Sequence, residues 1–116
     1  MPEAELGKWL RAAAVSDLED EDVLGVTIGE RGEHEIALYK IRGRFYATVD
    51  RCTHQSARLS DGLVIDDFIE CPLHQGRFHV PSGKAKSAPV SVPLKTYPTK
   101  VEKDMVYVLI DDGQSD

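Results

Sequence analysis

The chain has 116 residues, of which 41% are hydrophobic, and its formal net charge is -6. This length predicts a single domain with one core and leaves little room for a second site. A net negative chain is not expected to bind nucleic acid or an anionic membrane surface. No apolar stretch approaches the roughly 18 residues that a membrane-spanning helix needs, so no membrane segment is predicted.

The negative charge is concentrated in the first third of the chain. Residues 1–34 hold nine acidic and three basic residues. The acidic run at residues 17–22 is interpreted as a solvated loop, which is the usual state of such runs. Residues 1–6 lack the basic and apolar regions of a secretory signal peptide, so we expect a cytoplasmic protein.

The first ordered part of the chain predicts two strands with a short helical turn between them. Residues 8–12 and 23–28 predict the strands, and residues 15–18 predict the turn. Ser16 or Asp17 is expected to cap this turn, because either side chain can accept a hydrogen bond from a free backbone amide.

A β-hairpin is expected next. Residues 35–41 and 44–49 have strand-like composition and flank the dipeptide Arg42-Gly43. Such a two-residue connection with glycine favours a tight hairpin turn. His34, which precedes the hairpin, is expected at the surface in a turn.

The middle of the chain, about residues 50–86, is expected to form a smaller subdomain. Residues 55–62 predict a loop, and residues 63–65 and 68–71 predict a small hairpin. Loops on a rigid scaffold commonly carry functional residues.

The last part of the chain returns to the main body in this interpretation. Prolines at positions 89, 93 and 98 restrict it to loops and sheet edges. Residues 99–102 and 105–110 predict a final pair of strands. Many short strands separated by turns, without a long helical period, predict an antiparallel sandwich or barrel.

Both cysteines of the chain lie in the middle segment, and a histidine follows each of them closely. Cys52 and His54 are followed, after sixteen residues, by Cys71 and His74. Two thiolates and two imidazoles at matched spacing suit a small metal centre. With both cysteines on a metal, none is left for a disulfide, which suits a reducing compartment.

Three interpretations of these four residues compete. They could be two buried thiols with incidental histidines, a structural zinc site, or the ligands of a 2Fe-2S cluster. Zinc sites usually pair the cysteines with each other and the histidines with each other, whereas each arm here holds one of each. The mixed arms favour a cluster in which two histidines replace two cysteines on one iron.

The same stretch resembles the signature of the Rieske family. The residues that carry the resemblance are Cys52, His54, Cys71, His74, Pro72, Gly76 and Phe78. Nearly the whole chain is similar to the small bacterial Rieske ferredoxins of aromatic-ring-hydroxylating dioxygenase systems of the biphenyl and carbazole type.

The resemblance implies an all-β fold, namely the Rieske fold. This is an antiparallel β-sandwich with a smaller cluster-binding subdomain. Residues 1–116 would form a single Rieske domain, with the subdomain at about residues 50–86 and an acidic C-terminal tail at residues 111–116. One Rieske-type 2Fe-2S cluster would be bound by Cys52, His54, Cys71 and His74.

The implied function is electron transport in the catabolism of aromatic hydrocarbons. The chain would take single electrons from a flavin-containing ferredoxin reductase and pass them to a terminal oxygenase, and it would not be an enzyme itself. A terminal oxygenase needs a further iron site with two histidines and a carboxylate. After the cluster ligands, only His34 and His79 remain. We expect a cytoplasmic monomer.

Two other functions stay open at this point. A small Rieske-like subunit of an assimilatory nitrite reductase would use the same four ligands inside a stable complex. A zinc-stapled interaction module, from a different class of protein, would use them for a structural metal and would be colourless.

Overall fold

The computed structural model describes residues 7–51, 57–72, 76–87 and 92–110. Within them the chain forms antiparallel strands and two short 3-10 turns, with no α-helix. The fold is therefore all-β, as predicted. No helix in the described ranges is long and apolar enough to cross a membrane.

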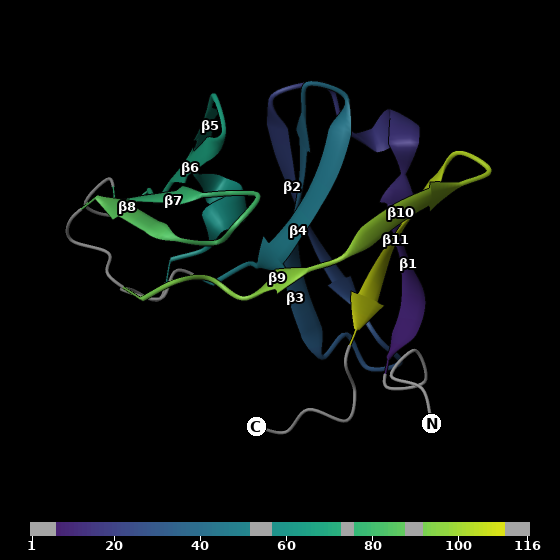
Figure 1. The fold of residues 1–116 in the computed structure, drawn as a ribbon. Coiled ribbons are helices and arrows are strands. Elements are labelled where there is room, and N and C mark those ends of the chain that lie inside the picture. Colours follow the sequence, from purple (N-terminus) through teal and green to yellow (C-terminus); the bar gives the residue numbers. More distant parts are fainter. Residues whose placement is uncertain (1–6, 52–56, 73–75, 88–91, 111–116) are drawn as a thin grey trace.

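Two sheets form the main body of the molecule (Figure 1). The first has the order β1-β11-β10, with β1 at Lys8–Ala14, β11 at Met105–Ile110 and β10 at Thr99–Glu102. The second has the order β2-β3-β4-β9, with β2 at Asp22–Ile28, β3 at His34–Ile41, β4 at Arg44–Val49 and β9 at Thr96–Tyr97. The first and last described strands, β1 and β11, are paired, so the body is closed by the two ends of the described chain.

A third sheet lies beside the body (Figure 1). Its order is β5-β6-β7-β8, with β5 at Leu63–Ile65, β6 at Phe68–Glu70, β7 at Arg77–His79 and β8 at Ala85–Ser87. We call it the small sheet. It falls within the segment that the sequence assigns to the cluster-binding subdomain, whose exact limits stay a prediction.

Two hydrophobic cores hold these sheets together. The body core consists of Ala13, Leu18, Ile28, Ile36, Leu38, Ala47, Val106, Val108 and Ile110. The small-sheet core consists of Ala37, Tyr39, Ile41, Leu59, Ile69, Cys71, Phe78, Val80 and Leu94. Strand β3 belongs to both, because successive side chains of a strand point to opposite faces. It therefore joins the small sheet to the body.

The predicted hairpin is confirmed as β3 and β4, joined at Arg42 and Gly43. Both turn residues have positive φ, 50° and 79°, which is the requirement of a type I′ turn. His34 was expected in a turn, but it is the first residue of β3 and pairs with Ile28. The backbone of β2 extends the sheet to this position.

The acidic run at residues 17–22 is more than a solvated loop. Asp20 accepts a hydrogen bond from the Gly43 amide at 2.9 Å, and Glu21 accepts one from the Arg42 amide at 3.2 Å. The Arg42 guanidinium in turn forms an ion pair with Asp67, in the turn between β5 and β6. The Asp20 and Glu21 carboxylates thus accept hydrogen bonds from the backbone amides of the hairpin turn. These contacts were not predicted, because the two acidic residues lie more than twenty positions before the turn.

The predicted cap of the first turn was wrong, and the predicted loop contains a short turn. The 3-10 turn η2 (Val15–Asp17) has Ala14 at its N-cap. The Asp17 carboxylate accepts a hydrogen bond from the Ala14 amide at 3.0 Å. Neither Ser16 nor Asp17 therefore occupies the cap position. Within the predicted loop 55–62, residues Leu59–Asp61 form a second 3-10 turn, η3.

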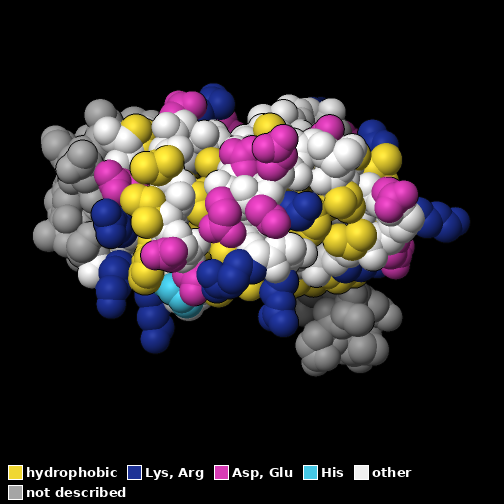
Figure 2. Space-filling model, turned by 90° about the horizontal axis from the view of Figure 1, so that it is seen from above, with side chains coloured by type: hydrophobic (Ala, Val, Ile, Leu, Met, Phe, Trp, Pro, Cys, Tyr) yellow, Lys and Arg dark blue, Asp and Glu magenta, His cyan; other side chains and the backbone are white. Residues whose placement is uncertain are grey.

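Charged side chains of both signs share the face drawn in Figure 2. Asp and Glu lie mainly near its middle, and Lys and Arg lie mainly along its lower rim. Charges of opposite sign are therefore distributed unevenly over this face.

Burial predicts a large difference between two leucines of the body and the small sheet. Leu38 in β3 is fully buried, whereas Leu63 in β5 is 60% exposed. We expect Leu38→Ala to lower the free energy of unfolding by about 2–5 kcal/mol. The matched Leu63→Ala should change it by about 0.5 kcal/mol or less. Guanidinium denaturation followed by circular dichroism measures both, and equal losses would contradict this assignment of the core.

Candidate metal centre

The structure describes one of the four predicted ligands. Cys71 lies directly after β6, is 1% exposed and packs in the small-sheet core. Cys52, His54 and His74 lie outside the described residues. Among the described residues, no group of three or more His, Cys, Asp and Glu side chains could hold a metal ion. The four-residue ligand set therefore stays a prediction.

Backbone hydrogen bonds hold the two ends of the second predicted ligand segment together. Strands β6 and β7 pair antiparallel up to Glu70 and Arg77, whose side chains also form an ion pair at 3.3 Å. Beyond this pair, the Cys71 amide donates a hydrogen bond to the Gly76 carbonyl at 2.8 Å. The chain thus leaves and re-enters the small sheet at adjacent positions around residues 72–75.

The ends of the first predicted ligand segment are held together in a similar way. Arg51 and Arg58 form an isolated antiparallel bridge, and the Leu59 amide donates to the Asp50 carbonyl at 2.7 Å. Leu59 is fully buried in the same core as Cys71. Both segments therefore start from one packed core, which is what a centre with ligands from two loops needs.

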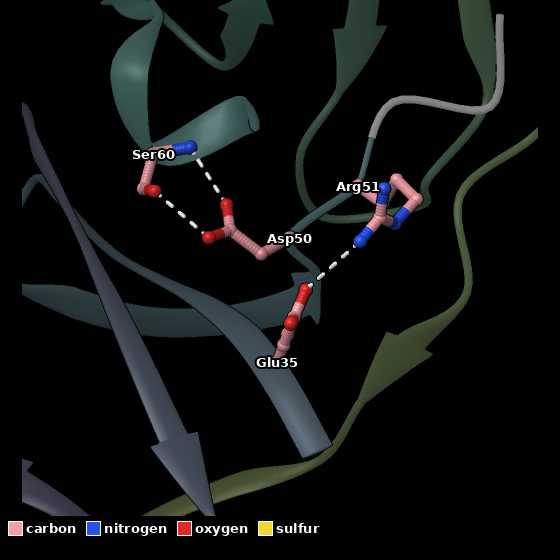
Figure 3. Close-up of polar contacts among 4 residues, drawn as sticks. All are labelled: Glu35, Asp50, Arg51 and Ser60. Carbon is pink, nitrogen blue, oxygen red and sulfur yellow. Dashed lines mark hydrogen bonds and ion pairs between the residues drawn. The ribbon is translucent and has the colours of Figure 1, made fainter. Parts of the chain in front are cut away.

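The Asp50 side chain, directly before the Arg51–Arg58 bridge, is a buried carboxylate (Figure 3). Asp50 is 2% exposed and accepts two hydrogen bonds from Ser60, one from the backbone amide at 2.7 Å and one from the hydroxyl at 2.8 Å. Burial raises the pKa of Asp50 above its ordinary value, because desolvation disfavours the charged form, and the Ser60 hydrogen bonds act in the opposite direction.

The neighbours of Asp50 are also ordered by hydrogen bonds and by an ion pair. Its own amide donates to the Glu35 carbonyl at 3.0 Å, and the Glu35 carboxylate pairs with Arg51 at 3.4 Å (Figure 3). Sequence reasoning missed both Asp50 and Ser60. The available signal was an acidic residue directly after the hydrophobic strand β4 and two positions before Cys52.

Two glycines allow the close packing around η3. A Cβ atom at Gly25 in β2 would lie 2.6 Å from the Ser60 hydroxyl oxygen and 3.0 Å from the Asp50 carboxylate. A Cβ atom at Gly62 would collide with the carbonyl oxygen of Glu70, the residue before Cys71. Neither glycine has a positive φ, so steric room and not backbone freedom is what these positions require.

The two histidines outside the predicted ligand set have other surroundings. His79 in β7 forms a hydrogen bond between Nδ1 and the Ser82 hydroxyl at 2.8 Å, and its ring packs edge-on against Phe68. His34 lies 3.7 Å from the Glu33 carboxylate. Substitutions of these two histidines therefore provide controls for the predicted histidine ligands.

Comparison with known proteins identifies the family. The family model for the Rieske [2Fe-2S] domain matches residues 8–98. The chain is 53% identical, over 104 residues, to the ferredoxin component of the naphthalene 1,2-dioxygenase system of Pseudomonas putida. This alignment covers 90% of the chain and 95% of that protein.

Solved structures agree with this assignment. The Sphingomonas yanoikuyae B1 ferredoxin is 35% identical, with a TM-score of 0.80, and the match covers 90% of this chain and 98% of that one. A chain in the complex of reduced oxygenase and oxidized ferredoxin in carbazole 1,9a-dioxygenase is 38% identical, with a TM-score of 0.79. This match covers 84% of the present chain and 98% of the chain in the complex. The chain therefore belongs to the Rieske [2Fe-2S] domain family, and it is an electron carrier with one Rieske-type cluster.

Proposed function

We propose that this chain is the ferredoxin component of a multicomponent aromatic-ring dioxygenase system and that it passes single electrons to the terminal oxygenase. The observation that carries the proposal is the 53% identity to a naphthalene dioxygenase ferredoxin over 90% of the chain. A related ferredoxin is found with its oxygenase in a solved complex, which supports the oxygenase as partner.

The electron donor in this proposal is a flavin-containing reductase. A flavin can accept a hydride from a nicotinamide and release the two electrons singly, as a one-electron carrier requires. The carrier acts as a monomer in the cytoplasm, where a reducing environment keeps Cys52 and Cys71 available as thiolates.

Cys52, His54, Cys71 and His74 hold the cluster in this proposal. Cys71 supports it, because a buried thiol at the end of a strand presents a soft ligand from which water is excluded. When bound, a Rieske-type 2Fe-2S cluster accepts and releases one electron. The chain contributes four ligand atoms from two segments. The ends of the first segment are joined by the Arg51–Arg58 bridge, and those of the second by the Cys71–Gly76 hydrogen bond.

The two alternative functions have weaker support. A zinc-stapled module does not agree with the match to the Rieske [2Fe-2S] domain over residues 8–98. A nitrite reductase subunit would share this domain, but the high identity is to dioxygenase ferredoxins. Stable copurification with a large sirohaem protein would favour the nitrite reductase subunit.

The ligand set predicts which histidines matter for the metal. Purified without oxygen, the wild type should contain about two irons and two acid-labile sulfides per chain. Cys71→Ala, His54→Ala and His74→Ala should lose most of this iron and the visible absorption. His34→Ala and His79→Ala are the matched controls and should keep both. The ligand set is wrong if a control loses iron while His54→Ala and His74→Ala retain it.

The carrier role can be tested by exchange into a known system. The reductase and terminal oxygenase of the Pseudomonas putida naphthalene system would be combined with this chain in place of their own ferredoxin. Product formation should depend on the added chain and fall to background with Cys71→Ala. A wild-type protein that has a full cluster and is reduced by dithionite, yet never reduces a dioxygenase oxygenase, would refute the proposed function.

A further inference from the structure

Asp50 is a buried carboxylic acid whose partners lie on both sides of the first ligand segment. Its amide donates to the Glu35 carbonyl at 3.0 Å, and its carbonyl accepts from the Leu59 amide at 2.7 Å. Each carboxylate oxygen accepts one hydrogen bond from Ser60, at 2.7 Å and 2.8 Å. Two accepting oxygens are the pattern of an ionised carboxylate. Among the described residues no cation lies within ion-pair distance of it, but the nearby positive charge of Arg58 acts to lower its pKa.

A carboxylate in this setting is costly for the fold. Burying it removes water, and two hydrogen bonds offset this cost in part. The surrounding backbone nevertheless makes room for it, because a side chain at Gly25 would push Ser60 and Asp50 apart. A buried carboxylate that no described cation contacts directly indicates a role beyond packing.

Its place in the chain supplies that explanation. Asp50 comes two residues before Cys52, and Ser60 lies in η3, beyond the other end of the same segment. The Asp50 carboxylate therefore connects the two ends of the segment through its side-chain hydrogen bonds with Ser60 (Figure 3). The Arg51–Arg58 bridge connects the same two ends through the backbone.

We propose that Asp50 is a positioning residue for the cluster. Its carboxylate clamps Ser60 and so keeps closed the base of the loop that carries Cys52 and His54. The inference rests on the proposed function, in which these two residues are ligands. The clamp slows the loss of the cluster, and the buried negative charge makes the addition of an electron less favourable.

Two substitutions separate the clamp from the charge. In Asp50→Asn the amide oxygen can still accept from the Ser60 amide, and the amide nitrogen can donate to the Ser60 hydroxyl. This variant keeps two contacts but loses the charge. Asp50→Ala loses both. Ser60→Ala removes one of the two hydrogen bonds and provides a milder break if Asp50→Ala does not fold.

The matched control is a buried hydrogen bond nearby that does not touch the loop. Thr48 in β4 is fully buried and lies 2.9 Å from the Tyr39 hydroxyl, oxygen to oxygen. Thr48→Val keeps the shape of the side chain and removes this bond, together with the 2.7 Å hydrogen bond that the Thr48 hydroxyl donates to the Val49 carbonyl. It should lower the free energy of unfolding without affecting how the cluster is held.

The experiment follows three readouts on protein purified without oxygen: iron release into excess chelator, the midpoint potential, and the electron paramagnetic resonance spectrum of the reduced protein. Asp50→Ala should release iron about tenfold faster, a factor within the range expected for hydrogen bonds to a charged group. Ser60→Ala should also release it faster, and Asp50→Ala should change the spectrum.

The remaining variants should behave differently. Asp50→Asn should release iron at close to the wild-type rate and have a higher potential. Thr48→Val should match the wild type in release rate, potential and spectrum.

Three outcomes would overturn the inference. These are iron release from Asp50→Ala and Ser60→Ala at the wild-type rate, release from Asp50→Asn as fast as from Asp50→Ala, or an equal acceleration in Thr48→Val. Each leaves the proposed function standing, because the wild type would still hold its cluster. A wild type without iron would refute the proposed ligand set and this inference with it.

Discussion

The burial of strand β3 on both faces is the constraint on which the rest of the molecule depends. One face of the strand packs in the body core and the other in the small-sheet core. Ile36, Ala37, Leu38 and Tyr39 are all fully buried as a result. Because a shift of one residue along the strand would exchange the two faces, the small sheet is fixed to the body in a single register.

Polar contacts around β3 then determine where the loops begin. The Glu35 carbonyl accepts a hydrogen bond from the Asp50 amide. The Asp50 carboxylate accepts one from Ser60, at the other end of the first predicted ligand segment. The Arg42–Asp67 ion pair connects the opposite end of the hairpin to the small sheet, but it is exposed and contributes little energy. The packed strand and the buried carboxylate therefore matter more than the surface charges for placing the candidate site.

Much of the fold and the family could be predicted from local patterns. The Arg42-Gly43 turn and the strand pairs around it follow from residue preferences that act over a few positions. The residue types and spacing of Cys52, His54, Cys71 and His74 indicated the cluster, because each arm carries one cysteine and one nearby histidine. The roles of Asp50 and Asp20 could not be predicted, because each depends on a partner brought near by strand pairing. Strands β7, β8 and β9 were missed, because two or three residues carry no periodicity of their own and, unlike β5 and β6, they were not recognised as a hairpin.

The pairing of Lys8 with Ile110 has a practical consequence for protein engineering. Both ends of the described chain leave the body from neighbouring strands, away from the small sheet (Figure 1). An affinity tag, a fluorescent reporter or a surface-immobilisation linker joined to the described ends of β1 and β11 would start away from the small sheet. The molecule is therefore suited to oriented attachment on an electrode, with the small sheet facing the solution.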